Sequence, residues 1–366
     1  MNTAFRFVYP FLPAIARGLG VPLEQAGYLI SMRHFAGLAT PGVVRTVGSG
    51  ELRRRLIVTG MLLFTVGAAV TVLTSAYVGA LVGFALIGLA KPVYDVSSQA
   101  YIADRVPYAR RARSLAVFEF TWAGALLVGA PAAGWLIARG SWTTPFLVFG
   151  VLTIAALAVV PVLVDPDLHG SMARVVRVRL DWSGRAFLVV AGLFSLASEM
   201  IVVVFGAWLE DAFGLSLVAL GGAAFLIGVA ELSGEGATFA FTDRLGKRRS
   251  VLIGLVISAA GFAMLVPARD EIGFGLAVLA IALFGFEFTI VSSIPLASEI
   301  QASSRARYLS WMVVAMSLAR AIGAAIGPAL FGTFGLPGPA LAAVVADVAA
   351  VAILVSWVRG GEDASM

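Results

Sequence analysis

The chain has 366 residues, of which 60% are hydrophobic and 13% are charged, with a formal net charge of +5 and no cysteine. So few polar side chains cannot cover a soluble particle of this length, and without cysteine the chain cannot form disulfides, thiolate nucleophiles or cysteine metal sites. The composition is that of an integral membrane protein.

Apolar stretches follow one another along the chain, each of roughly 18 to 25 residues, the length that a helix needs to cross a hydrocarbon core of about 30 Å. Their centres lie near Tyr9, Phe35, Thr65, Gly88, Leu126, Thr153, Phe194, Val229, Ser258, Phe284, Ala319 and Ala349. The sequence therefore predicts an all-α membrane protein with twelve transmembrane helices. The first span contains Arg6, Pro10, Pro13 and Arg17, and we expect it to be truncated, either by a start assigned too late or by a shortened chain.

Basic residues cluster after every second predicted span. The clusters are Arg45 with Arg53, Arg54 and Arg55; Arg105 with Arg110, Arg111 and Arg113; Arg174, Arg177, Arg179 and Arg185; Arg244 with Lys247, Arg248 and Arg249; Arg305 with Arg307; and Arg359. Short loops rich in arginine and lysine remain cytoplasmic, so we expect a protein of the inner (cytoplasmic) membrane with both termini inside. Arginines at helix ends meet anionic lipid headgroups, and no nucleic-acid partner is expected.

The longest polar and basic stretch of the chain, residues 165–185, separates the first six predicted spans from the last six. We expect an N-terminal six-helix bundle at 1–165, a cytoplasmic linker at 166–184, a C-terminal six-helix bundle at 185–358 and a cytoplasmic tail at 359–366. A weak repeat supports this division, because the basic triplet 53–55 recurs at 247–249 and Pro131 recurs as Pro328. Parallel repeats of six helices are the plan of one large transporter class.

The segment 242–249 has the sequence TDRLGKRR and resembles the D-R-x-G-[RK]-[RK]-[RK] loop signature of the major facilitator superfamily. The matching loop at 41–48 lacks the aspartate, whereas the segment 129–134, GAPAAG, resembles the signature of that family's antiporters. The stretch from Gly88 to Pro145 most resembles the bacterial sugar-efflux and drug-efflux branches of this family. Resemblance to the family implies two pseudo-symmetric six-helix bundles and a cytoplasmic gate formed by Asp243, Arg244, Gly246 and Arg113.

Ionisable residues inside the predicted spans mark the candidate site, because a charge at the bilayer centre costs about 2.5 to 3.5 kcal/mol on insertion scales. Glu231 and Glu235 stand four residues apart on one helix face and cannot both ionise cheaply, so we expect one of them to hold a proton. With Glu119 they are the candidates for proton coupling, although glutamates that only tie helices together would give the same pattern. The candidates for the substrate cavity are Arg6, Arg33, Asp95, Glu199, Glu287 and Arg320.

The sequence thus predicts a secondary active transporter that exports a small organic molecule, drug-like or sugar-like, in exchange for protons. We expect a monomer without metal or cofactor. Two alternatives remain open: proton-coupled uptake or lipid flipping by the same fold, and a membrane sensor that binds a ligand without moving it. An enzyme is not expected, because no pairing of nucleophile and base, metal-ligand spacing or phosphate loop appears.

Overall fold

The computed structural model describes residues 1–47, 53–74, 76–165, 180–301 and 304–358, and no strand occurs in these ranges. The N-terminal half contains α1 (Asn2–Arg6), α2 (Leu12–Leu19), α3 (Leu23–Gly37), α4 (Thr40–Val47), α5 (Arg53–Thr74), α6 (Tyr77–Arg105), α7 (Tyr108–Gly124), the π-helix η1 (Ala125–Gly129), α8 (Ala130–Arg139) and α9 (Thr144–Leu163). The C-terminal half contains α10 (Trp182–Val202), α11 (Phe205–Phe213), α12 (Leu217–Leu245), α13 (Lys247–Ala268), α14 (Ile272–Ile300), α15 (Arg305–Phe334) and α16 (Pro337–Trp357).

Ten segments of the described chain are long and apolar enough to cross a bilayer. They correspond to the third to twelfth predicted spans, and two of them join neighbouring helices: 120–139 contains η1 and α8, and 182–213 contains α10 and α11. The first two predicted spans consist instead of shorter helices, α1 with α2 and α3 with α4. Ten of the twelve predicted membrane spans are therefore found within the described residues, and the other two are interrupted.

The first predicted span is interrupted directly after α1. Pro10 has no N–H group for the carbonyl of Arg6, and its ring would clash with that carbonyl in a continuous helix. The backbone N–H of Tyr9 bonds to the Arg6 carbonyl at 3.3 Å, three residues back. The Phe5 carbonyl, which this N–H would reach in an α-helix, accepts a hydrogen bond from Nη1 of the buried Arg33 instead.

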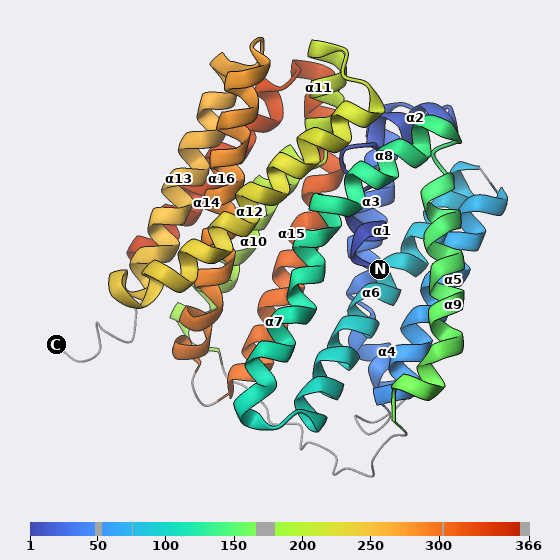
Figure 1. Cartoon of the computed structure of the whole chain (residues 1–366). Helices are drawn as coiled ribbons and strands as arrows, with labels where there is room; N and C mark the ends of the chain where they lie inside the picture. The colour runs from blue at the N-terminus through green and yellow to red at the C-terminus, as the bar shows by residue number, and fades with distance from the viewer. Residues whose placement is uncertain (48–52, 75, 166–179, 302–303, 359–366) are drawn as a thin grey trace.

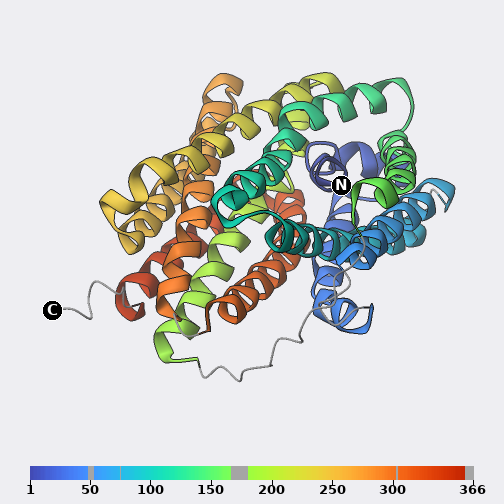
Figure 2. The same cartoon turned by 60° about the horizontal axis from the view of Figure 1, so that its bottom comes forward.

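The helices form two groups, α1 to α9 in blue to green and α10 to α16 in yellow-green to red, which lie side by side in both views (Figure 1, Figure 2). We call one end of the molecule the arginine-rich side; Arg53, Arg105, Arg244 and Arg248 lie there, where α5 and α13 begin and α6 and α12 end. It is the lower end in Figure 1, and α2 and α11 lie at the opposite end. The chain begins at mid-height of the bundle (Figure 1). The predicted linker at 166–179 and the tail at 359–366 lie outside the described residues.

The two halves meet mainly toward the end opposite the arginine-rich side. There α15 packs along α3, and α12 packs along η1 and α8. Gly206 of α11 approaches Pro10 so closely that a Cβ atom at position 206 would lie 2.3 Å from the Pro10 carbonyl oxygen. Arg17 of α2 also forms an ion pair with Glu210 of α11. In contrast, α6 and α14, which end on the arginine-rich side, pack mainly within their own halves.

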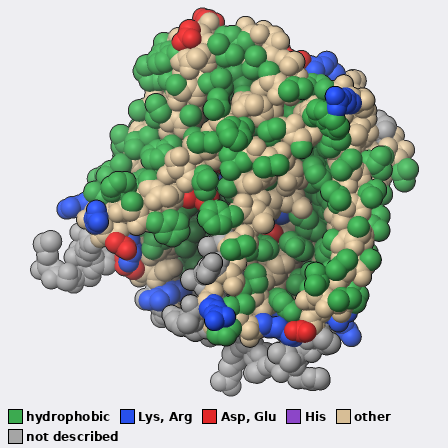
Figure 3. Space-filling view, viewed as in Figure 1, with side chains coloured by type: hydrophobic (Ala, Val, Ile, Leu, Met, Phe, Trp, Pro, Cys, Tyr) green, Lys and Arg blue, Asp and Glu red, His purple; other side chains and the backbone are tan. Residues whose placement is uncertain are grey.

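The outer surface shows why this bundle requires a membrane. Hydrophobic side chains cover the middle of the molecule in Figure 3, and acidic and basic side chains gather mainly near its two ends. Large apolar side chains such as Leu73, Val162 and Phe239 are more than 80% exposed. A soluble protein would not present such a continuous apolar surface to water.

The contact between Gly206 and Pro10 can be tested by adding one methyl group. We expect Gly206→Ala to lower the stability of the detergent-solubilised protein by about 1 to 3 kcal/mol, because the added carbon would overlap a backbone carbonyl. Gly222→Ala is the matched control, since no atom lies within 4 Å of its added Cβ. Thermal unfolding followed by circular dichroism would measure both, and equal melting temperatures for the two variants would contradict the close contact.

The orientation in the membrane can be tested with single cysteines, because the natural chain has none. We expect Leu245→Cys, at the end of α12 on the arginine-rich side, to react with a membrane-impermeant maleimide only in inside-out vesicles. Ser216→Cys, at the start of α12 on the opposite side, should react in right-side-out vesicles. The reverse labelling pattern would contradict the expected orientation.

Candidate functional site

A cavity of about 150 Å³ lies between the two halves of the protein. Its charged lining residues are Arg6, Glu199, Glu231, Glu287 and Arg320, all of which are predicted site residues. Three aromatic side chains, Tyr9, Trp122 and Phe286, form part of the same wall. The structure therefore gathers charges from α1, α10, α12, α14 and α15, which are distant in sequence, around one space.

Interrupted helices supply two of the cavity walls. The chain leaves α1 after Arg6 and passes through Tyr9, while α10 ends at Val202 and a turn precedes α11. Non-helical backbone at membrane depth is tolerated only where it is buried in protein or lines a cavity. Because Gly206 lies against Pro10, the two interruptions adjoin, and side chains beside them face the same space.

An ion pair inside the cavity joins the two halves. Nη2 of Arg6, at the end of α1, lies 2.7 and 2.6 Å from the two carboxylate oxygens of Glu231 on α12. Both side chains are only 7% exposed. The guanidinium of Arg6 also lies over the ring of Trp122, 4.5 Å from its centre. Burial of both charges makes this contact far less screened than a surface ion pair.

A second polar contact between the halves centres on Glu199 of α10. The hydroxyl of Tyr9 donates to one carboxylate oxygen of Glu199 at 2.9 Å, and Nε2 of His34 lies 3.3 Å from the same oxygen. Arg320 of α15 lies 3.8 Å from the other oxygen. His34 is not one of the predicted site residues, and the signal for it in the sequence is a polar residue beside Arg33 in an otherwise apolar span.

Glu287 of α14 differs from the other two cavity glutamates. It is 8% exposed, and the structure gives it no hydrogen bond or ion pair with another described residue. Electrostatic interactions reach it from Glu231, Glu235, Arg6 and Arg320. The sequence predicts that Glu231 and Glu235 cannot both ionise cheaply, but in the structure Arg6 neutralises the charge of Glu231. Among the glutamates that line the cavity, Glu287 is therefore the one that forms no ion pair with a described residue.

Three other predicted residues are not among those that line the cavity. Arg33 is buried behind Phe5, with its guanidinium carbon 3.7 Å from the centre of that ring. Asp95 forms an ion pair with Lys91 one turn earlier on α6. Glu235 is half-buried on α12, one turn beyond Glu231, and is not among the lining residues. Acidic and basic residues in and beside the cavity thus form mixed pairs, Arg6 with Glu231 and Lys91 with Asp95.

The remaining predicted residues stay predictions. The side chains of Glu119 and Arg113 lie outside the described part of the structure, although α7 passes through both positions. Asp243 and Arg244 are exposed at the end of α12, and Gly246, with φ of 85°, ends that helix. Nearby, an ion pair between Lys247 and Glu299 joins α13 to α14, on the side where the gate is predicted.

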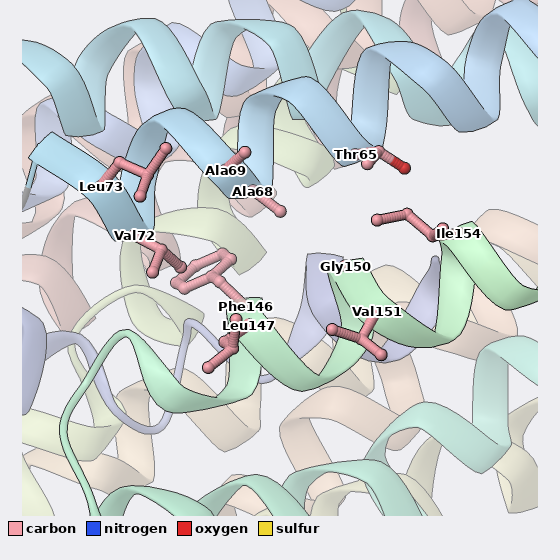
Figure 4. Close-up of a pocket in the computed structure, with 10 residues that line it drawn as sticks. All are labelled: Thr65, Ala68, Ala69, Val72, Leu73, Phe146, Leu147, Gly150, Val151 and Ile154. Atoms are coloured by element: carbon pink, nitrogen blue, oxygen red, sulfur yellow. The ribbon is translucent and has the colours of Figure 1, made fainter.

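A second cavity, of about 160 Å³, lies between α5 and α9 (Figure 4). Figure 4 shows Val72 and Phe146 close together at one end of it, and Thr65 and Ile154 at the other. The only hydroxyl group in its lining, that of Thr65, already donates to the Met61 carbonyl at 2.9 Å. This space therefore offers apolar contact alone, which is ordinary for a surface that faces lipid.

Comparisons with known proteins agree with this arrangement. The family model described as Major Facilitator Superfamily matches residues 1–234. The chain is 23% identical over 341 residues to the uncharacterized MFS-type transporter YwfA of Bacillus subtilis, covering 89% of this chain and 80% of that protein. It is 27% identical over 289 residues to the class G tetracycline resistance protein of Vibrio anguillarum, covering 72% of this chain and 70% of that protein.

Similarity to solved structures extends over nearly the whole chain. A crystal structure of a D-xylose-proton symporter matches with a TM-score of 0.74 and 17% identity, covering 98% of this chain and 97% of that one. Identity this low establishes the fold alone. The family model, however, covers more than half of the chain, and its match agrees with the loop signature at 242–249 and the charged cavity between two helical halves. The chain is a transporter that belongs to the Major Facilitator Superfamily, not an enzyme.

Proposed function

We propose that this protein exports a small organic molecule in exchange for protons, by alternating access to the cavity between its halves. Substrate would enter from the arginine-rich side, toward which the two halves make fewer contacts, and leave on the opposite side. The proposal rests above all on the buried ion pair between Arg6 and Glu231, because it links the conformation of the halves to the charge of one carboxyl.

A proton on Glu231 would remove the negative charge that holds Arg6. The contact between α1 and α12 would then lose its electrostatic attraction, and a buried arginine would be left without its counter-ion. A ligand shifts a conformational equilibrium only by its different affinity for the two states, and this pair supplies such a difference for the proton. In this proposal, the state with the pair formed is the one from which the proton has been released.

Glu287 makes the same region a proton-binding cluster. It interacts electrostatically with Glu231 and Glu235, and also with Arg6 and Arg320, but it forms no ion pair with a described basic residue. Neighbouring carboxyl groups that interact strongly exchange protons as a group rather than singly. We therefore assign the coupling proton to the cluster of Glu231, Glu235 and Glu287. Glu119 remains a candidate on the adjacent helix α7.

Export, rather than uptake, is supported by the segment that resembles the antiporter signature. Its residues 129–134 span the end of η1 and the start of α8, and η1 is a local π-helix, a feature often found at functional sites. Pro131 of this segment lies against Gly221, and Leu126 of η1 lies against Gly228, so the segment and η1 both pack directly on the helix that carries Glu231. One relative is named as a tetracycline resistance protein, which makes tetracycline a reasonable first probe.

Proton coupling can be tested with Glu231→Gln in proteoliposomes loaded with tetracycline. Coupling free energies between sites are about 1 to 3 kcal/mol, so we expect efflux driven by a pH gradient to fall by roughly 5- to 150-fold. Exchange of labelled for unlabelled tetracycline without a gradient should continue, because that process needs no net proton movement. The flux of both tetracycline and protons would be measured.

Asp270→Asn is the control variant, because Asp270 is exposed and its ion pair is with the adjacent Arg269. Equal gradient-driven efflux in the parent protein, the control and Glu231→Gln would contradict the assigned coupling site. Movement of tetracycline and protons in the same direction would instead favour proton-coupled symport. Binding of tetracycline without any transport would favour a sensor.

A further inference from the structure

We propose that the cavity recognises a zwitterion, whose ammonium group binds Glu287 and whose carboxylate binds Arg320. This inference rests on the proposed transport function and names its substrate class. Five charged residues line the cavity, and two of them form no hydrogen bond with another described residue.

Three of the five charges are already engaged by the protein. Arg6 and Glu231 neutralise each other at 2.6 Å. Glu199 accepts a hydrogen bond from Tyr9 at 2.9 Å and has His34 at 3.3 Å. A substrate would have to displace these contacts in order to use any of the three.

Glu287 and Arg320 are the other two, and they carry opposite charges. Glu287 has no hydrogen bond or ion pair within the described residues. The nearest carboxylate oxygen to Arg320 is that of Glu199 at 3.8 Å, beyond hydrogen-bond distance, and the Arg320 side chain is 22% exposed. Its guanidinium faces the ring of Phe286 at 5.6 Å, beside Glu287 in the sequence, so both charges belong to one stretch of wall.

The chemistry of these two groups defines the complementary ligand. A carboxylate accepts hydrogen bonds from an ammonium group, and a guanidinium binds a carboxylate through parallel N–H donors. A ligand with only one charge would leave either Glu287 without a partner or Arg320 with only the Glu199 oxygen at 3.8 Å, which is costly in a site of low dielectric constant. Tyr9, Trp122 and Ile290 line the same space and offer contact surface for an apolar body.

Substrate and proton would exchange at Glu287. An ammonium group and a proton compete for the same carboxylate, so either occupant of Glu287 excludes the other. A purely anionic ligand would favour a protonated Glu287 and would therefore move with a proton rather than against it. The zwitterion is the class that uses both open charges and still competes with the proton.

Four probes with a common phenylethyl body separate the possible ligand classes. They are phenylalanine, which carries both charges, phenethylamine, hydrocinnamate and phenethyl alcohol. Binding to the full-length protein in detergent would be measured by isothermal titration calorimetry at neutral pH. We expect phenylalanine to bind at least about tenfold more tightly than each of the others, because each charged hydrogen bond is worth about 1.5 to 3 kcal/mol.

The variants Glu287→Gln and Arg320→Gln assign each end of the ligand. Glu287→Gln should lower phenylalanine affinity to that of hydrocinnamate, and Arg320→Gln should lower it to that of phenethylamine. Thermal unfolding without ligand would verify that each variant is folded, and Asp270→Asn should bind like the parent protein. Binding of phenethyl alcohol as tight as that of phenylalanine, tighter binding of either singly charged probe, or no binding of any probe would overturn the inference.

Proton release into a weakly buffered solution distinguishes this inference from the proposed function. Preferential phenylalanine binding without proton release would leave the zwitterion site standing and contradict proton exchange. Conversely, proton-coupled transport of tetracycline in both Gln variants, at the rate of the parent protein, would leave the transport function standing and overturn the assigned groups.

Discussion

The cost of placing charge inside a membrane is the constraint on which the arrangement of this protein depends. A charged side chain at the bilayer centre costs about 2.5 to 3.5 kcal/mol on insertion scales, so it is retained only with a partner or beside water. Arg6 and Glu231 meet this condition by pairing with each other, although one belongs to α1 and the other to α12. The interaction that makes both charges tolerable is therefore the same one that joins the two halves.

Interrupted helices add a second contact beside this pair. The helix α1 ends at Arg6, and the non-helical chain before Pro10 carries Tyr9, whose hydroxyl donates to Glu199. The partner interruption between α10 and α11 lies close by, because Gly206 packs against the Pro10 carbonyl. Arg33 satisfies the Phe5 carbonyl that the break sets free, so a residue behind the cavity wall supports residues within it.

Much of this architecture could be predicted from the sequence, but the pairing within the site could not. Apolar length and arginine spacing indicated the helical membrane bundle, and Pro10 warned of a poor first span, yet nothing in the sequence marks the interruption after Val202. Helical spacing pairs Glu231 with Glu235, because spacing along one helix relates only residues that are close in the sequence. The actual partner of Glu231 is Arg6, 225 residues away, a contact that only the packing of the two halves creates. The same packing places Glu287 in the cavity wall without an ion pair to another described residue, and the sequence alone does not show this.

The central claim is that the charge of Glu231 determines which side of the membrane the cavity faces. Ser198→Cys tests it directly, because Ser198 lines the cavity and the chain contains no other cysteine. In the otherwise unchanged protein, an impermeant maleimide should reach this cysteine from the arginine-rich side. Adding Glu231→Gln, which mimics the protonated carboxyl, should shift labelling toward the opposite side. Labelling from the same side and at the same rate with and without Glu231→Gln would contradict the account.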